Sequence, residues 1–241
     1  MSKELVIYQT TDVHGYILTT NFLEYKPWGF AKVVEYIENQ KDENKLLIDS
    51  GDFIQGSPLT YYVSKNKYSS HPIIELLNIA NYNIFTIGNH EFNFSKSYLE
   101  DALSSFKGDV LNANIKGLDI DSKPYKIYDY EGVKICILGL TTKYIPNWEE
   151  PENIKGLEFL DPIEVYRLYE KEMKEQSDFI IVNYHGGFEK DLENHTEPTE
   201  ELTGENQGSE LLNTFDSIDI LLTGHQHRGF IKETKNTWKR L

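Results

Sequence analysis

The sequence predicts an α/β fold that contains a mixed sheet. Short apolar runs typical of strands alternate with segments in which apolar residues recur at helical spacing, and this alternation favours helices layered on sheets. Tyr128–Val133 contains Glu131-Gly132 between two strand-like runs, which predicts an antiparallel hairpin in the middle of the chain. With 241 residues, 39% of them hydrophobic, the chain can bury a sizeable core in one large domain or two small ones.

The apolar runs place the expected elements in order along the chain. Strands are expected at Leu5–Gln9, Leu46–Asp49, Ile84–Ile87, Val110–Asn112, Tyr125–Tyr130, Val133–Leu140, Phe179–Asn183 and Ile218–Leu222, and helices at Phe30–Asn39, Ile73–Asn81, Ser97–Phe106 and Pro162–Gln176. Asp161 before Pro162 predicts a helix start, because Asp caps helix N-termini and Pro favours the first helical position. The polar segment Glu193–Ser209 is expected to be a surface loop, either a plain connection or part of the mouth of a site.

The charge balance is acidic, with 24 Lys and Arg residues against 39 Asp and Glu residues and a formal net charge of −15. This argues against a nucleic-acid partner, because neutralising a phosphate backbone needs clustered Lys and Arg. A nucleotide or small phosphoester substrate is compatible with it, since bound metal ions can supply the local positive charge. No run approaches the roughly 18 apolar residues of a membrane span, so no membrane association is expected. The sequence carries no signal for an oligomeric state.

The N-terminus and the cysteine content bear on the compartment. Met1–Glu4 leads directly into a short apolar run, without the basic flank and longer apolar stretch of a signal peptide, so we expect a cytoplasmic protein. A removed leader would leave an extracellular or cell-surface location open. Cys136 is the only cysteine, which excludes an intrachain disulfide. It lies in an apolar run and is expected to be a small buried hydrophobe.

Polar side chains that carry chemistry follow five of the expected strands. They are Thr11-Asp12-Val13-His14-Gly15, Asp49-Ser50-Gly51-Asp52-Phe53, Gly88-Asn89-His90-Glu91, Tyr184-His185-Gly186-Gly187 and Gly224-His225-Gln226-His227. In open α/β sheets, ligands bind beyond the carboxyl ends of the strands, where glycines let the backbone approach closely. His225 and His227 are further expected to point the same way, as alternate residues of an extended segment do. Each motif alone is commonplace, but five in one domain predict a shared site.

The same residues resemble a known family. Asp12 and His14, Asp52, Asn89 and His90, His185, and His225 and His227 look like the motif set of the calcineurin-like metallophosphoesterases. The longer stretches 49–58 and 88–93 resemble the 5′-nucleotidase and 2′,3′-cyclic-nucleotide 2′-phosphodiesterase superfamily. The resemblance covers nearly the whole chain and implies a four-layer α/β/β/α sandwich of mixed sheets.

The resemblance also implies two divalent metal ions, Mn²⁺, Zn²⁺, Fe or Mg²⁺. One would be held by Asp12, His14 and His227, the other by Asn89, His185 and His225, with Asp52 bridging both. Carboxylate and imidazole ligands suit these metals, and a site without thiolates disfavours a structural zinc cage. Two such cations about 3.5–4 Å apart can activate a shared water and stabilise the attacking and leaving oxygens.

The expected catalytic residues are His90, Asn89 and Asn93. His90 matches the family's histidine that stabilises the transition state or protonates the leaving oxygen, and imidazole exchanges a proton near neutral pH. In the 5′-nucleotidase branch the residue three positions later is usually an Asp that pairs with this histidine, whereas here it is Asn93. An amide can orient the ring but brings no full charge. Together with the loop Ile54-Gln55-Gly56-Ser57-Pro58, Asn93 resembles the cyclic-nucleotide phosphodiesterase/3′-nucleotidase branch. His71 and His195 match no motif and are expected to be structural or at the surface, and Gln226 is expected to point away from the ligands.

The resemblance runs out near the end of the chain. Family members normally continue past the Gly-His-x-His loop with further strand, a linker helix and a nucleotide-binding domain, whereas only Arg228–Leu241 follow here. We therefore expect residues 1–241 to be a catalytic domain that lacks its last strands and the C-terminal nucleotide-binding domain. The favoured function is that of a metal-dependent 2′,3′-cyclic-nucleotide 2′-phosphodiesterase/3′-nucleotidase. A 5′-nucleotidase or nucleotide-sugar hydrolase, and a truncated, non-catalytic remnant that binds metal or nucleotide, remain as alternatives.

Overall fold

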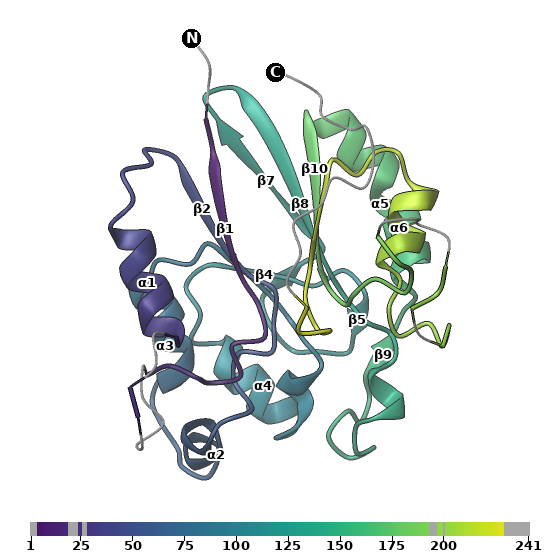
Figure 1. Ribbon diagram of the computed structural model, residues 1–241. Coiled ribbons are helices and arrows are strands. Elements are labelled where there is room, and N and C mark those ends of the chain that lie inside the picture. The colour runs from purple at the N-terminus through teal and green to yellow at the C-terminus, as the bar shows by residue number, and fades with distance from the viewer. Residues whose placement is uncertain (1–3, 19–23, 26–27, 193–196, 200, 229–241) are drawn as a thin grey trace.

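The computed structural model of the protein describes residues 4–18, 24–25, 28–192, 197–199 and 201–228 (Figure 1). Its strands are β1 (Val6–Thr10), β2 (Lys45–Asp49), β3 (Ile84–Thr86), β4 (Asp109–Leu111), β5 (Ile115–Lys116), β6 (Ser122–Lys123), β7 (Tyr125–Tyr130), β8 (Val133–Thr141), β9 (Glu158–Phe159), β10 (Phe179–His185) and β11 (Ile220–Thr223). Its helices are α1 (Phe30–Glu38), α2 (Pro58–Ser64), α3 (Pro72–Ile79), α4 (Lys96–Leu103), α5 (Pro162–Gln176) and α6 (Gly208–Thr214), with 3₁₀ turns η1 (His90–Phe92) and η2 (Ile145–Asn147).

Two sheets form the centre of the fold. The first has the order β1-β2-β3-β4-β6, and each neighbouring pair in it is parallel. The second has the order β11-β10-β8-β7, with β8, β10 and β11 parallel and β7 antiparallel. The expected hairpin is confirmed, since Tyr130 pairs with Val133 and both Glu131 and Gly132 have positive φ. Of these two sheets, only the second contains both parallel and antiparallel strand pairs.

Three apolar layers separate four structural layers, which confirms the predicted α/β/β/α sandwich. Leu46 and Ile48 face the second sheet, where they pack with Ile137, whereas Leu47 between them packs with the helices of the first sheet. Cys136 is fully buried, as expected, and faces α5 and α6. This alternation follows from the period of two along a strand. Figure 1 shows α1 and α3 on one side of the paired sheets and α5 and α6 on the other.

The predicted elements agree with the structure for the long, patterned segments and miss several short ones. Helix α5 begins as predicted, with the Asp161 side chain accepting hydrogen bonds from the amides of Ile163 and Glu164. Helix α6 begins at Gly208, so the expected loop Glu193–Ser209 extends too far. Helix α2 was also missed, although Ser57 forms a capping box ahead of Pro58. Both helices have only seven residues, too few to show a clear apolar period.

A buried polar network joins the two sheets at the carboxyl ends of their strands. Ser50 Oγ donates to Asn183 Oδ1 at 2.6 Å, and Asn183 Nδ2 donates to Thr86 Oγ1 at 2.7 Å. Gln9 Nε2 donates to Ser50 Oγ at 2.7 Å and to the carbonyl of Thr223 at 3.0 Å. These bonds hold the loops after β1, β2, β3, β10 and β11 at one end of the sandwich. Among the described residues, no helix has both the length and the apolarity needed to cross a membrane.

Candidate metal centre

Three of the five loops, those after β1, β2 and β11, hold their polar residues in unusual backbone conformations. Eight non-glycine residues in the described part of the chain have positive φ, and five of them are expected metal ligands: Asp12, His14, Asp52, His225 and His227. Left-handed backbone costs free energy for residues with a Cβ, so such positions persist where the surrounding structure fixes them and they cluster at functional sites. The loops therefore direct these side chains toward one region at the expense of local backbone preference.

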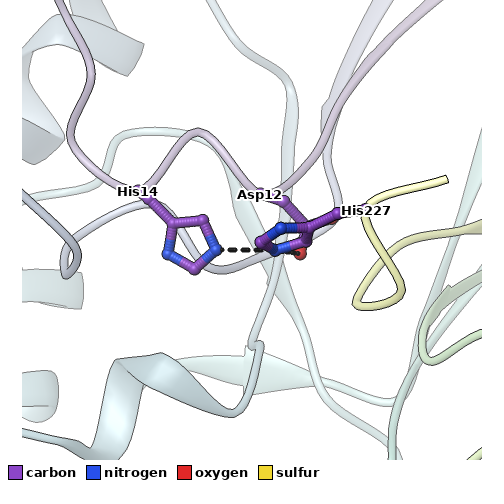
Figure 2. A group of neighbouring side chains, drawn as sticks. All are labelled: Asp12, His14 and His227. Carbon is purple, nitrogen blue, oxygen red and sulfur yellow. Dashed lines mark hydrogen bonds and ion pairs between the residues drawn. The ribbon is translucent and has the colours of Figure 1, made fainter. Parts of the chain in front are cut away.

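Asp12, His14 and His227 form the first cluster (Figure 2). Figure 2 shows their side chains converging from the loop after β1 and the loop after β11. His14 Nε2 lies 2.9 Å from His227 Nε2, and His227 Nε2 lies 3.3 Å from Asp12 Oδ1. One ligand atom from each residue lies within 4.8 Å of the others, a spacing at which three side chains can share one cation.

Asp52, His185 and His225 form the second cluster, with Asn89 beside it. His185 Nε2 lies 3.2 Å from Asp52 Oδ2 and 3.0 Å from Asn89 Oδ1, and His225 Nδ1 lies 2.9 Å from Asn89 Oδ1. Asp52 and His185 are almost fully buried. The structure therefore brings all seven residues that the sequence suggested as ligands into two neighbouring clusters.

One carboxylate oxygen lies between the clusters and lacks a partner. Asp52 Oδ1 accepts a hydrogen bond from the backbone amide of His90 at 2.7 Å. Asp52 Oδ2 is buried, accepts no hydrogen bond, and lies 3.2 Å from His185 Nε2 and 3.9 Å from His14 Nε2. A buried carboxylate oxygen without a partner carries a large desolvation cost. A cation on each side would satisfy it, which is the arrangement expected of a bridging carboxylate.

Outer hydrogen bonds determine which ring nitrogen each histidine presents to the clusters. Nδ1 of His14 lies 3.0 Å from the carbonyl of Gln55, and Nδ1 of His185 lies 2.6 Å from the carbonyl of Ser50. Nε2 of His225 lies 2.9 Å from Glu205 Oε1. Because a carbonyl or carboxylate can only accept, each of these nitrogens carries the proton in the neutral ring, and the other nitrogen faces the cluster as an acceptor. Metal-ligating histidines are commonly held in this way.

The resulting sites favour positive charge. In the neutral rings, the bare nitrogen of His185 would face Asp52 Oδ2 and Asn89 Oδ1, and that of His225 would face Asn89 Oδ1. A cation resolves this opposition of lone pairs. Burial lowers the pKa of His185, but the Asp52 carboxylate outweighs burial and raises that pKa to about 10. Burial likewise opposes ionisation of Asp52, but His185 outweighs it and holds the pKa of Asp52 below its ordinary value. The donor set fits divalent cations that prefer imidazole and oxygen ligands.

His90 lies beside both clusters without belonging to either. Its ring centroid is 5.1 Å from that of His14, and its Nδ1 lies 2.6 Å from Asn93 Oδ1. A hollow of about 400 Å³ opens next to it, lined by Asn89, His90, Asn93, Ile145, Trp148, Glu149, Glu205 and His225. The expected catalytic residues thus line a hollow that borders the second cluster through Asn89 and His225.

The structure corrects the prediction for His225 and His227 and shows the positions of Gln226 and His71. His225 and His227 do not belong to an extended segment that points one way. Their φ values are 71° and 52°, so the backbone turns at each of them and sends the two rings to different clusters. Gln226 points away as expected and hydrogen-bonds both backbone groups of Phe188. His71 is structural, since it caps α3 and contacts the Tyr98 hydroxyl. His195 lies outside the described residues.

Three glutamates that sequence reasoning passed over contact the site. Glu91 accepts backbone hydrogen bonds from the loop that carries Asp52, Glu205 contacts His225, and Glu149 contacts Asn93. Glu91 could have been noticed, because it completes the Gly-Asn-His-Glu stretch. Glu205 falls in the polar segment for which a role at the mouth of a site was one of two expectations. Nothing in the sequence around Glu149 indicates its partner.

Comparisons with known proteins agree with the geometry. A family model described as calcineurin-like phosphoesterase matches residues 5–229. The sequence is 30% identical over 250 residues to the 2′,3′-cyclic-nucleotide 2′-phosphodiesterase/3′-nucleotidase of Haemophilus influenzae, which covers 94% of this chain and 36% of that protein. The chain thus spans about a third of that relative's length.

Solved structures show the same fold. A Staphylococcus aureus protein proposed to be a 5′-nucleotidase, solved in complex with alpha-ketoglutarate, superposes with a TM-score of 0.90 at 41% identity, covering 96% of this chain and 47% of that one. The calcineurin-like phosphoesterase YfkN of Bacillus subtilis superposes with a TM-score of 0.81 at 28% identity, covering 98% of this chain and 76% of that one. Because the family model covers nearly the whole chain and the fold matches that of these structures, this chain belongs to the calcineurin-like phosphoesterase family.

Proposed function

We propose that this chain is a dinuclear metal-dependent phosphoesterase that hydrolyses nucleotides, with 2′,3′-cyclic nucleotides and 3′-nucleotides as its favoured substrates. The observation that carries the proposal is the buried, unpartnered Oδ2 of Asp52, which lies between His14 and His185. A protein gains nothing in stability from such an oxygen, whereas a pair of cations gives it two partners.

The residues of this chain would divide the work as follows. Asp12, His14 and His227 would hold one cation, Asn89, His185 and His225 the other, and Asp52 would contact both. When bound, the cations would activate water and neutralise charge on the phosphoryl oxygens. His90 Nδ1 faces Asn93 Oδ1, which leaves Nε2 directed to the substrate. In the protonated ring, where both nitrogens carry a proton, Nε2 would donate a hydrogen bond to a phosphoryl oxygen or give its proton to the leaving ribose oxygen.

Two observations favour the cyclic-nucleotide branch. The partner of His90 is the amide of Asn93 rather than a carboxylate, and at this position an Asn resembles the cyclic-nucleotide branch. The Haemophilus relative carries the name of a 2′,3′-cyclic-nucleotide 2′-phosphodiesterase/3′-nucleotidase. A 5′-nucleotidase is the second candidate, because the Staphylococcus structure is described as one.

The test is a comparison of substrates and metals on the purified chain. The protein is stripped of metal, reloaded separately with Mn²⁺, Zn²⁺ or Mg²⁺, and assayed for phosphate and nucleoside release from 2′,3′-cyclic AMP, 3′-AMP and 5′-AMP. We expect metal-dependent turnover that is fastest on 2′,3′-cyclic AMP and is lost in His90→Ala. Lys155→Ala is the control that should keep full activity, because the Lys155 side chain is exposed and pairs only with the exposed Glu152 among the ion pairs of the described residues.

Other outcomes of this assay would favour a different function. Faster turnover of 5′-AMP than of the cyclic nucleotide would assign the 5′-nucleotidase branch. Metal uptake without turnover on any substrate would replace the proposal with a non-catalytic metal- or nucleotide-binding role. Elemental analysis of the protein as purified identifies the metal that it acquires in the cell.

A further inference from the structure

A chain of hydrogen bonds continues outward from His90 to a residue on a different part of the fold. His90 Nδ1 lies 2.6 Å from Asn93 Oδ1, and Asn93 Nδ2 donates to Glu149 Oε2 at 2.6 Å. Glu149 is 56 residues beyond Asn93 in the sequence and follows the 3₁₀ turn η2. The chain thus joins the loop after β3 to the loop after β8, on the side of the site that borders the hollow.

The carboxylate decides which way the Asn93 amide faces. An ionised carboxylate only accepts hydrogen bonds, so the group that Asn93 turns toward Glu149 must be its NH₂ and the group turned toward His90 must be its oxygen. An amide oxygen in turn requires a proton on His90 Nδ1 in the neutral ring. Flipping the amide would face an NH₂ toward Nδ1 and favour the opposite tautomer, with the proton on Nε2.

Hydrogen bonds hold the Glu149 carboxylate in place, so it can fix the orientation of the Asn93 amide. Its Oε1 accepts from the backbone amide of Glu150 at 2.8 Å and from Asn153 Nδ2 at 2.8 Å. Asn153 Nδ2 also reaches the backbone carbonyl of Asn93 at 3.4 Å. Both carboxylate oxygens therefore have donors, and Oε2 is left facing Asn93. In this series of hydrogen bonds, the Asn93 amide lies between the His90 imidazole and the Glu149 carboxylate.

We propose that Glu149 is a positioning residue, which fixes the amide of Asn93 and through it the tautomer and ring orientation of His90. The proposal rests on the proposed function for its kinetic part, because only there does His90 act on a substrate. Its structural part, the tautomer of His90, stands on the hydrogen bonds alone. Without Glu149 the amide is free to rotate, and in the rotated molecules its NH₂ faces His90 Nδ1, so the ring loses the acceptor that holds it.

The kinetic test compares Glu149→Ala with Glu150→Ala. The two variants remove the same charge from adjacent positions, but the Glu150 side chain is exposed and lies outside the chain of hydrogen bonds. In protein loaded with metal, we expect Glu149→Ala to lower kcat about tenfold, the scale of lost outer-sphere partners, with KM within twofold of the parent. Glu150→Ala should match the parent. Equal kcat in both variants, or a loss confined to KM, would overturn the proposal.

A second background separates positioning from general damage. Asp at position 93 has two acceptor oxygens and needs no neighbour to orient it, so in Asn93→Asp the further change Glu149→Ala should cost no kcat. It should even relieve the repulsion between two carboxylates. If Glu149→Ala lowers kcat by the same factor in both backgrounds, the residue acts through something other than the Asn93 amide, and the proposal fails.

A spectroscopic readout tests the structural part without turnover. Nitrogen-15 shifts of the His90 ring, recorded in zinc-loaded and metal-free protein above the range in which imidazole titrates, report which nitrogen carries the proton. We expect a proton on Nδ1 in the parent and a mixture of tautomers in Glu149→Ala. Unchanged shifts would refute the inference even in an active enzyme. Inactivity of the parent on all substrates, with the tautomer shift observed, would count against the proposed function alone.

Discussion

Glu91 offers the sharpest test of how the site is built, through the change Glu91→Gln. Its side chain is fully buried and holds two loops together. Oε2 accepts from the amides of Asp52 and Gly88, both at 2.7 Å, and Oε1 accepts from the amides of Phe53 at 2.7 Å and Ile54 at 3.3 Å. Four backbone donors thus meet a single carboxylate between the loop after β2 and the loop after β3.

The magnitude follows from this geometry. Whichever way the amide of Gln is turned, its NH₂ faces two backbone N–H groups and leaves both without an acceptor. A buried donor without a partner costs about 1–3 kcal/mol, so two of them give a loss of about 2–6 kcal/mol in the free energy of unfolding. This is a large part of the about 5–15 kcal/mol that stabilises a typical domain.

The loss should also reach the metal site, because Glu91 holds the backbone of Asp52. Asp52 has a φ of 59° and depends on its neighbours to keep that conformation. Changes to groups that support metal ligands typically lower metal affinity or activity about 10- to 100-fold. We therefore expect Glu91→Gln to weaken metal binding in addition to destabilising the fold.

The assays are urea unfolding followed by circular dichroism and calorimetric titration with Mn²⁺. Glu152→Gln is the matched control, since its side chain is 83% exposed and surface substitutions of this kind change stability by less than about 0.5 kcal/mol. An unfolding midpoint for Glu91→Gln equal to that of Glu152→Gln would refute the reasoning. So would loss of stability with metal affinity unchanged, which would uncouple Glu91 from Asp52.

Three further predictions concern single positions. Asp52→Asn removes the carboxylate that raises the pKa of His185, so in metal-free protein the NMR-monitored pKa of His185 should fall, and calorimetry should show the loss of at least one Mn²⁺ per chain; an unchanged titration would contradict the assignment. Asp161→Ala should lower the free energy of unfolding by about 1 kcal/mol through loss of the α5 cap, whereas Asp161→Asn keeps the cap. Burial raises the pKa of Asp161, but Lys143 and the helix amides outweigh burial and lower that pKa. The stabilisation is therefore present above the unfolded-state pKa and is lost as pH falls through the folded-state pKa. Urea midpoints for the parent and Asp161→Ala should converge in acid, and a difference that widens there would contradict this. Gly139→Ala would place a Cβ 2.4 Å from the carbonyl oxygen of Leu111 and should cost about 1–3 kcal/mol, so a melting temperature equal to the parent's would show that the strands can separate there without penalty.

The fold class and the residues of the candidate site could be predicted from local sequence patterns. Strand patterns are local, so the runs around Leu46 and Ile137 could be recognised without knowing their partners. The candidate site residues follow strand ends and lie beside glycines, as at Gly51-Asp52 and Gly88-Asn89-His90. Such motifs consist of consecutive residues, so they can be recognised in the sequence. The short helices α2 and α6 were lost, because seven residues hold too few turns to show a period.

The division of these residues between two clusters, and the side chains that support them, follow from contacts between distant segments of the folded chain. His225 and His227 are two residues apart, yet left-handed backbone at both sends their rings to different clusters. Glu149 and Glu205 contact Asn93 and His225, although in the sequence they resemble any other glutamate, whereas Glu91 at least belongs to a motif. Their roles arise from hydrogen bonds that form when separate loops meet. Contacts between segments that are distant in the sequence cannot be predicted from local sequence patterns.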